Sequence, residues 1–456
     1  MGATPSQQHP RPGTVTGFLA ALSPRLASGR FAREVMTLQV GSLVTMGVQF
    51  ATSVAIANLL GPNLLGTYVQ ATAVLNTVNL LANLAVGQAL ITRLAAAYAR
   101  RDEDESLGLM AYFLKVSATI GAVEAVVGLL GGSYLGAVIV GDARIGEMAA
   151  VLFVNPLLLV FFNMVVMALQ STRQVARLTL LENGAFVLTS LLNVTVVALG
   201  WGVTGLLWTV AFTPAITSVA AAILYQSTLP RMPGLPGLGA VVRAAFGVPF
   251  RQHFVFSALV SVDKNMFNFM NLLPTLLLSR LASDADVAFF RVGYNLMNFL
   301  SVPLAPISRN LYAKLSEILA TGDACRLGRS LLRVSLASGG ISMLTTLAML
   351  VLSPLILSIY RPEYAAVQPV IYALGLRFAL MGFGVGLGPI YQVLDAMKLA
   401  IVTKLVPAAI MFFGGWVMVG SYGAVGAALT VVLAYLVGDI TNALLVPWML
   451  RRAGSR

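Results

Sequence analysis

Six polar side chains follow one another at steps of three or four residues within the apolar segment 254–277. This spacing places them on one helix face, and the segment is long enough to cross a bilayer. Asp263 and Lys264 lie near its middle, where a membrane tolerates charge least. We interpret the stripe as one wall of a hydrated cavity; the alternative is a polar face packed against other helices. The stripe consists of Ser257, Ser261, Lys264, Asn268, Asn271 and Thr275.

Two further apolar segments carry polar side chains on one face. Such amides could simply hold helices together, at ~0.6–2 kcal/mol for each hydrogen bond in a membrane. Considered together with the stripe in 254–277, they favour a hydrophilic cavity shared by several helices. These residues are Asn76, Asn79 and Asn83 in the segment 67–92, and Arg291, Asn295 and Asn298 in the segment 288–311.

Five charged residues lie near the middle of apolar segments. A lipid-facing charge at that depth costs ~2.5–3.5 kcal/mol, so five would cost roughly 12–18 kcal/mol, as much as the whole stability of a domain at ~5–15 kcal/mol. They must therefore face a cavity or one another. The five are Glu124, Asp263, Lys264, Arg377 and Asp439.

These charges suggest two kinds of chemistry. Lys264 and Arg377, with Arg291 at the outer end of a polar stripe, are the cations that could hold a phosphate group, with nearby amides around it. Asp263, Glu124 and Asp439 are acids that could carry a coupling ion, either H⁺ or Na⁺. Asp263 is the strongest of the three because it adjoins the stripe; the alternative is that it only neutralises a neighbouring cation.

The composition is that of a polytopic membrane protein. Of 456 residues, 58% are hydrophobic and 10% charged, and the mean hydropathy is +0.86. One cysteine and two histidines argue against an internal disulfide and a metal centre. No P-loop motif occurs, so we expect no nucleotide and no cofactor beyond a coupling ion. The net charge of +12 lies mostly in short segments between apolar ones, so we expect no nucleic-acid partner.

We predict an all-α membrane protein of about twelve transmembrane helices in two pseudo-symmetric six-helix bundles. Its parts are a cytoplasmic tail, 1–34, with a possible membrane-surface helix; a first bundle, 35–225; a cytoplasmic linker, 226–252; a second bundle, 253–450; and a tail, 451–456. The predicted spans are 35–59, 67–92, 109–133, 148–169, 178–199, 204–225, 254–277, 288–311, 331–353, 369–392, 400–419 and 425–447.

The distribution of basic residues predicts the orientation. Segments on one side of the predicted spans carry 22 Lys and Arg residues, and segments on the other side carry four. Because basic loops stay in the cytoplasm, both termini are expected there. The acidic run 102–105 is then expected to be a solvated cytoplasmic loop.

The two halves of the chain repeat each other at a common offset. Trp201–Gly205 and Tyr422–Gly426 share the pattern aromatic-Gly-x-x-Gly, 221 positions apart, and Arg177 and Lys398 are also 221 apart. Repeats of six spans share one orientation and are related by an axis along the membrane normal.

Four motifs resemble those of a known family. Leu59–Tyr68, LLGPNLLGTY, resembles the first-loop signature of the polysaccharide flippases, which belong to the multidrug/oligosaccharidyl-lipid/polysaccharide exporter superfamily. Asp286–Phe290 and Tyr422–Gly426 are similar to the elements before the eighth and twelfth spans. Tyr360–Tyr364 is similar to the loop after the ninth, with Arg361 where glycine is usual. The resemblance covers roughly residues 30–450.

The resemblance implies a V-shaped, MATE-like transporter and not an enzyme. Such a protein flips undecaprenyl-pyrophosphate-linked oligosaccharides to the periplasmic leaflet of the bacterial inner membrane, for O-antigen or exopolysaccharide synthesis. Its partners would be the lipid-linked oligosaccharide, membrane lipids, a polysaccharide polymerase and glycosyltransferases. Some relatives hold the pyrophosphate with cations in the first span; this chain has none there, which leaves Lys264, Arg291 or Arg377.

Three other functions compete with this one. A MATE-type multidrug or cation antiporter has the same fold but favours an acidic, aromatic cavity, whereas the predicted cavity is more basic. A major-facilitator carrier would have a GxxxDRxGRR loop, which is absent. A membrane glycosyltransferase, polymerase or ligase would need a large extramembrane loop, and no predicted connection is that long.

Overall fold

The computed structural model is helical throughout its regular structure, with no strand in the part of the chain it describes. The described residues are 29–82, 86–250, 254–304, 307, 311, 315, 318, 324–387, 390–391, 394 and 396–454. The tail 1–28, and with it most of the predicted surface helix, lies outside them.

The N-terminal half contains four long helices and one interrupted one. The helix α2 bends at Gly61. The φ of 74° at this position is one that glycine adopts readily, because it has no Cβ atom. The elements are α2 Gly29–Ala82, α3 Val86–Arg100, α4 Glu103–Ile139, α5 Ala143–Ala149, η1 Ala150–Val154, α6 Asn155–Leu158, α7 Val160–Ser171, α8 Val175–Ala198, α9 Gly202–Thr228, η2 Leu229–Arg231 and α10 Leu238–Ala245.

The C-terminal half follows a similar plan. Its last long helix, α17, bends at Gly423, with φ 52° and ψ −129°. The elements are α11 Phe254–Leu281, α12 Asp284–Asn298, η3 Phe299–Leu304, α14 Ala324–Leu357, η4 Pro362–Ala366, α15 Val367–Met381, η5 Gly382–Gly384 and α17 Met397–Gly454.

The helices account for the predicted spans. Eight helices of the described chain are long and apolar enough to cross a membrane. Two of these, Gly41–Ala82 and Leu399–Met449, contain the bends at Gly61 and Gly423 and carry two predicted spans each. The helices α11 and α12 supply the remaining two. The prediction of an all-α membrane protein with about twelve spans in two bundles is confirmed.

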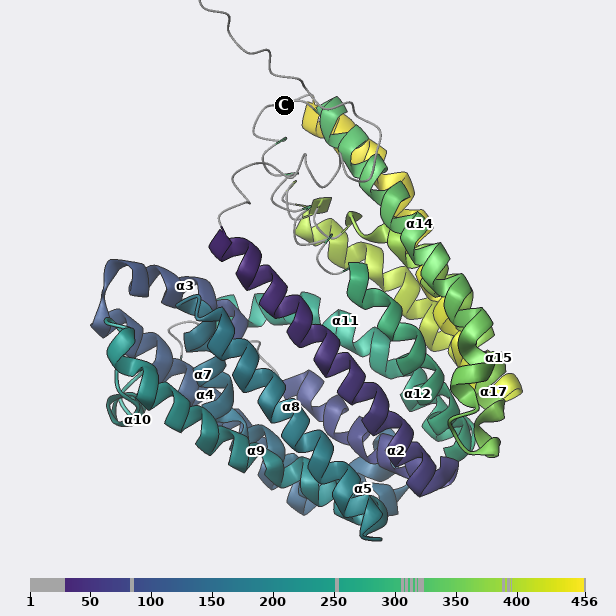
Figure 1. Ribbon diagram of the computed structural model, residues 1–456, viewed down its shortest axis with the longest axis horizontal. Coiled ribbons are helices and arrows are strands. Elements are labelled where there is room, and N and C mark those ends of the chain that lie inside the picture. Colours follow the sequence, from purple (N-terminus) through teal and green to yellow (C-terminus); the bar gives the residue numbers. More distant parts are fainter. Residues whose placement is uncertain are drawn as a thin grey trace, which may run out of the picture.

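The two halves converge at one end and diverge toward the other (Figure 1). One buried core contains residues of both halves, such as Val74 and Leu206 together with Val287 and Ile371. Two smaller cores lie apart from it, one within the N-terminal half and one within the C-terminal half. We call the converging end, which carries the turns at Gly61, Gly141, Gly200, Ser283, Arg361 and Gly423, the closed end.

Hydrogen bonds join the two halves at the closed end. Asn58 of α2 donates to the carbonyl of Ile359, 2.8 Å, and accepts from the backbone N–H of Arg361, 2.8 Å. The Tyr364 hydroxyl donates to the carbonyl of Ala57, 3.2 Å. A Cβ atom at Gly61 would lie 3.3 Å from Nη1 of Arg361, so the motif Leu59–Tyr68 and the motif Tyr360–Tyr364 meet in space, although about 300 residues separate them.

Asp284 forms a second junction at this end. Its carboxylate accepts from the Gln70 side-chain amide at 2.6 Å and from the Thr67 hydroxyl at 3.3 Å. Gly66 lies so close that a Cβ atom there would be 1.8 Å from the Asp284 carbonyl oxygen. No other residue type fits at Gly66 unless the halves separate.

The repeat seen in the sequence is also a structural repeat. Gly202 and Gly423, 221 positions apart, both have positive φ, at 59° and 52°. Gly205 and Gly426 both pack too tightly for a side chain, since a Cβ would lie 2.2 Å from Val196 Cγ1 and 1.9 Å from the Met418 carbonyl oxygen. The two aromatic-Gly-x-x-Gly turns thus use their glycines in the same way.

The segment between the halves packs against the N-terminal half. Met232 and Val241 are fully buried in the core of that half. The Tyr225 hydroxyl donates to the Pro236 carbonyl at 2.7 Å, and Lys115 of α4 donates to the Val248 carbonyl at 2.9 Å. The linker region therefore contains the helix α10 and is held against α4 and α9.

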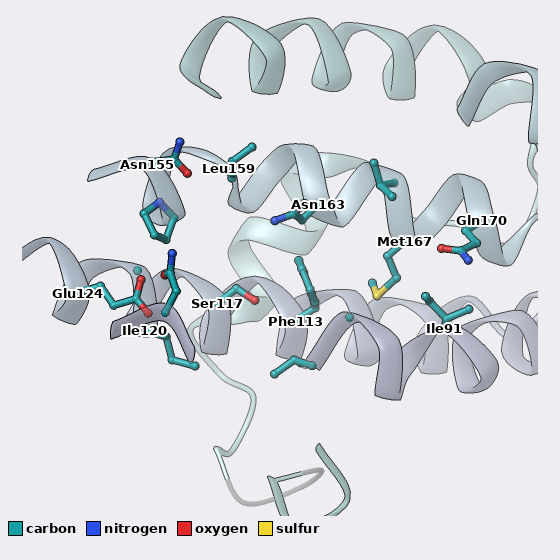
Figure 2. Close-up of a pocket in the computed structure, with 16 residues that line it drawn as sticks. Ile91, Phe113, Ser117, Ile120, Glu124, Asn155, Leu159, Asn163, Met167 and Gln170 are labelled. Atoms are coloured by element: carbon teal, nitrogen blue, oxygen red, sulfur yellow. The ribbon is translucent and has the colours of Figure 1, made fainter. Parts of the chain in front are cut away.

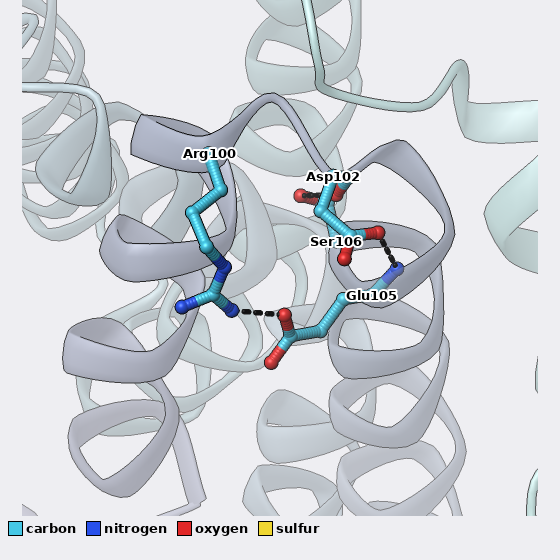
Figure 3. Close-up of polar contacts among 4 residues, drawn as sticks. All are labelled: Arg100, Asp102, Glu105 and Ser106. Carbon is cyan, nitrogen blue, oxygen red and sulfur yellow. Dashed lines mark hydrogen bonds and ion pairs between the residues drawn. The ribbon is translucent and has the colours of Figure 1, made fainter.

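The acidic run 102–105 is exposed, as expected, but it is not a loop: it begins α4 (Figure 3). Asp102 is the N-cap, and its carboxylate accepts from the backbone N–H of Glu105 at 2.9 Å. Glu105 also pairs with the exposed Arg100. Acidic residues in a first turn complement the helix dipole, so this exposed run serves to start the helix.

Candidate functional site

The C-terminal half contains a polar group that we call the charged cluster: Arg377, Asp439, Tyr435, Asn271 and Tyr294. Arg377 lies 3.9 Å from the Asp439 carboxylate, and its guanidinium carbon lies 4.0 Å from the centre of the Tyr435 ring. The two charged side chains are 17% and 33% exposed. Each charge therefore has a partner and is also reachable from outside the helix bundle.

The amide of Asn271 connects three helices of the cluster, α11, α12 and α17. Its oxygen accepts from the Tyr435 hydroxyl at 3.1 Å and from the Tyr294 hydroxyl at 3.2 Å. Tyr294 in turn packs edge-on against Phe378, beside Arg377. The cluster thus takes one residue from α11, one from α12, one from α15 and two from α17.

The geometry around Arg377 suits anion binding. A separation of 3.9 Å is longer than a hydrogen bond, so Asp439 neutralises the arginine without forming a close bidentate pair. A guanidinium presents a planar fork of donors that matches a phosphate. An incoming phosphate would compete with a loose partner.

The N-terminal half contains a pocket of about 520 Å³ between α4 and α6–α7, which we call the amide pocket (Figure 2). The described lining contains one acid, Glu124, which is only 3% exposed. With the Asn79 amide turned to satisfy both groups, its nitrogen donates to the two Glu124 oxygens at 2.7 and 3.2 Å. The polar residues lining the pocket are Asn79, Ser117, Glu124, Asn155, Asn163 and Gln170.

Local helix geometry explains this lining. On α4, Phe113, Ser117, Ile120 and Glu124 follow at steps of four, three and four, which is one helix face. The opposite wall begins where the 3₁₀ turn η1 gives way to α6. There the Asn155 amide donates to the Val210 carbonyl of α9 at 2.7 Å, which fixes its side chain.

A smaller pocket, about 370 Å³, lies on the other side of the same wall. It is lined by Asn155 and Glu182 together with threonines of α8 and α9. Glu182 is thus the second carboxylate of the N-terminal half that faces a pocket.

The structure brings some of the predicted site residues together and separates others. Arg377, Asp439 and Asn271 meet in the charged cluster, and Asn79 meets Glu124. Asn79 and Asn271 each bond within their own half, Asn79 to Glu124 and Asn271 to Tyr294 and Tyr435.

The remaining predicted residues lie elsewhere. Arg291 and Asn298 of α12, Asn268 of α11 and Asn76 of α2 are exposed, and Asn295 is half-buried. Asp263 and Lys264 belong to α11, but their side chains lie outside the described part, as does Asn83 altogether.

Sequence reasoning missed Tyr294 and Tyr435, and it also missed three amides in and directly after the fourth predicted span. Asn155, Asn163 and Gln170 are spaced eight and seven residues apart. Because seven or eight residues make about two helical turns, this spacing places one amide on the same helix face every two turns. That sparse periodicity was the available signal, and the apolar residues between them obscured it.

Comparison with protein families gives a match over residues 31–318, more than half of the chain, to the family described as "Polysaccharide biosynthesis protein". The chain belongs to the polysaccharide biosynthesis protein family. A search among curated proteins found no significant match.

Solved structures share the fold of this polysaccharide biosynthesis protein. It is similar to a multidrug resistance MATE family transporter of the MOP superfamily in an inward-facing conformation, with a TM-score of 0.73 and 14% identity, covering 92% of this chain and 99% of that one. A multidrug resistance MATE family transporter of the MOP superfamily in an outward-facing conformation matches with a TM-score of 0.60 and 16% identity, covering 93% of this chain and 96% of that one. A MOP superfamily transporter from Pyrococcus furiosus, described as having a binding pocket of reverse polarity, matches with a TM-score of 0.59 and 16% identity. This match covers 92% of this chain and 96% of that one. The chain is therefore a multi-pass membrane protein with a MATE-like fold.

Proposed function

We propose that this protein flips an undecaprenyl-pyrophosphate-linked oligosaccharide across the bacterial inner membrane for surface polysaccharide synthesis. The observation that carries the proposal is the charged cluster: an arginine held within the membrane fold of a polysaccharide biosynthesis protein, partly exposed and loosely paired. Pyrophosphate needs cations, and Arg377 with Arg291, and Lys264 on α11, are the candidates. The amides Asn76, Asn83, Asn268, Asn271, Asn295 and Asn298 are the candidate ligands around them.

Transport would proceed by alternating access. The halves are joined by one continuous core at the closed end and have separate cores elsewhere. In the orientation that the basic residues predict, the closed end faces the periplasm and the substrate enters from the cytoplasm. Opening then requires the contacts of Asn58 and Asp284 with the other half to break.

The orientation can be tested by labelling single cysteines in a Cys325→Ala background. Cysteines at Asn63, Gly141 and Glu363, all exposed at the closed end, should react with a membrane-impermeant maleimide in intact cells. Cysteines at Glu103 and Ser227 should react only after permeabilisation. The reverse labelling pattern would show that the protein has the opposite orientation in the membrane.

Function itself can be tested by deleting the gene and restoring variants. Loss of the gene should abolish the surface glycan and cause lipid-linked oligosaccharide to accumulate on the cytoplasmic leaflet. The wild-type gene should reverse both, and Arg377→Ala at equal protein level should reverse neither. Normal glycan in the deletion strain would refute the proposal.

A MATE-type multidrug or cation antiporter is the second candidate, favoured by one observation. Glu124 lies in a pocket whose described lining contains no Lys, Arg or His. An acid without a basic neighbour is what a site for an organic cation would require. In that case the deletion strain would keep its glycan and become sensitive to ethidium, and Glu124→Gln would not restore resistance.

Coupling to an ion gradient is part of the proposal. Asp263, Glu124 and Asp439 are the candidate carriers of H⁺ or Na⁺, and Asp439 is the one whose described side chain lies beside a cation. In proteoliposomes, Asp263→Asn should remove the gradient dependence of flipping while substrate still binds. Dependence that survives in Asp263→Asn would transfer the role to Glu124 or Asp439.

A further inference from the structure

We propose that the amide pocket is a subsite for uncharged sugar rings of the transported glycan, separate from the site of its phosphates. This inference rests on the proposed function and adds a division of labour to it: the C-terminal half holds the charged part of the substrate, and the N-terminal half holds a neutral part. Four properties of the pocket support this assignment.

The first property is the mixture of donors and acceptors. Each side-chain amide offers two N–H donors and a carbonyl acceptor, and a carboxyl group offers acceptors in either protonation state. A sugar hydroxyl both donates and accepts, so amides can satisfy it in any rotation. Four amides, one hydroxyl and one carboxyl group line the pocket.

The second property is that part of this capacity is available. The side-chain amides of Asn163 and Gln170 are exposed and make no hydrogen bond within the described part of the chain. Asn155 is fixed through its nitrogen by the Val210 carbonyl. Deeper in the pocket, Asn79 and Glu124 satisfy each other. The deep pair therefore shapes the floor, while the outer amides are ready to bind.

The third property is selection against anions. None of the sixteen described lining residues is Lys, Arg or His. A phosphate or a sugar carboxylate that entered would lose hydration and gain no cation in return. The pocket should therefore reject uronic acids and pyrophosphate, which the charged cluster of the other half could accept.

The fourth property is size and shape. A volume of about 520 Å³ lies within the usual range for small-ligand sites, ~300–1,000 Å³. Phe113 and Met167 also line it, and a flat aromatic ring offers an apolar surface for the C–H face of a sugar.

The test is saturation-transfer NMR on the full-length protein in nanodiscs, with maltose, N-acetylglucosamine and glucuronate as separate probes. The neutral sugars should receive saturation, and glucuronate should bind at least tenfold more weakly. The double variant Asn163→Leu, Gln170→Leu should bind neutral sugars at least fivefold more weakly. Gln226→Leu, which alters an exposed amide of α9 outside the pocket, should bind them like the wild type.

A second variant keeps the test decisive if the leucine variant fails to fold. Asn163→Lys places a cation at the exposed edge of the pocket and should increase glucuronate binding at least fivefold. Absence of binding by any neutral sugar, equal binding of glucuronate and N-acetylglucosamine to the wild type, or binding of ethidium in place of sugars would overturn the assignment.

Failure of this inference differs from failure of the proposed function. If the pocket does not bind sugars but the protein flips lipid-linked glycan, export persists in the double leucine variant while the Arg377→Ala variant is inactive. If the protein is not a flippase, deletion of its gene leaves the surface glycan unchanged, whatever the NMR result.

Discussion

The two halves of this protein share a helix plan but treat buried charge in opposite ways. In the N-terminal half, Glu124 is 3% exposed and is satisfied by the neutral amide of Asn79. In the C-terminal half, Arg377 is satisfied by another charge, Asp439, and by the face of an aromatic ring, and both charges are partly exposed. A repeated fold therefore surrounds its charged side chains with a neutral amide in one half and with an opposite charge and an aromatic ring in the other.

The largest effect is expected when the cation of the C-terminal half is removed. Arg377→Ala should reduce glycan export at least tenfold, equivalent to ~1.4 kcal/mol of transition-state stabilisation, because the substrate phosphates lose a partner. The measurement is flipping of fluorescent lipid-linked oligosaccharide in proteoliposomes. Arg377→Lys should recover part of the rate, since a lysine keeps the charge but not the planar fork.

A double variant separates the roles of Arg377 in binding and folding. Arg377→Ala with Asp439→Asn leaves no unpaired charge, so it should restore the protein level if that has fallen, without restoring export. Restored export would show that Arg377 only neutralises Asp439. The contrast between the halves would then reflect protein stability and not substrate binding.

The two equivalent turns offer a direct comparison of the halves. Gly423→Ala should lower the free energy of unfolding by roughly 2–4 kcal/mol. The loss has two causes: position 423 has a positive φ, and the new Cβ atom would lie only 2.6 Å from Asp286 Oδ1. Gly202→Ala should cost only ~1–2 kcal/mol, because nothing lies within 4 Å of its Cβ position.

Thermal unfolding in detergent, followed by intrinsic fluorescence, would measure this difference. Gly184→Ala, at an uncrowded helical position of α8, is the control and should be neutral or slightly stabilising. Equal losses in Gly202→Ala and Gly423→Ala would mean that the contact of Gly423 with Asp286 adds nothing.

The smallest effect is expected at the two carboxylates. Asp439→Asn leaves Arg377 without its counter-charge and should destabilise the protein by ~1 kcal/mol or less, because both groups are partly exposed. Glu124→Gln keeps the size of the side chain and an oxygen to accept from Asn79, so it should change stability even less. The same unfolding assay applies, and a larger loss in Glu124→Gln would show that the N-terminal half requires a negative charge.

The fold could be predicted from the sequence because it depends on quantities that a sequence carries directly. Apolar length determined the spans, and the glycines of Trp201–Gly205 and Tyr422–Gly426 marked turns whose backbone needs glycine. The sites were less accessible, because they depend on which helices meet. Nothing in the sequence pairs Arg377 with Asp439, 62 residues away.

The missed residues have a similar cause. The sequence assigns no role to Tyr294 or Tyr435, because only the packing of α12 and α17 against α11 directs both hydroxyls at Asn271. Asn163 lies in the predicted span 148–169 and Gln170 directly after it, within Ala143–Ser171, the most apolar of the eight candidate membrane helices of the described chain, where sparse amides barely change the hydropathy. An amide alone does not reveal whether it faces lipid, a neighbouring helix or a pocket.

The pairing of Arg377 with Asp439 also has a consequence for biosynthesis. The lining of the amide pocket ends at Gln170, and the Val210 carbonyl that fixes Asn155 follows only 40 residues later. Arg377 must instead enter the membrane before Asp439 has been made. At ~5–20 residues per second, 62 residues correspond to roughly 3–12 s of translation, during which the arginine lacks its carboxylate. A ribosome that stalls in this interval would leave an unpaired intramembrane arginine, and such a truncated chain should be a preferred substrate for membrane quality-control proteases.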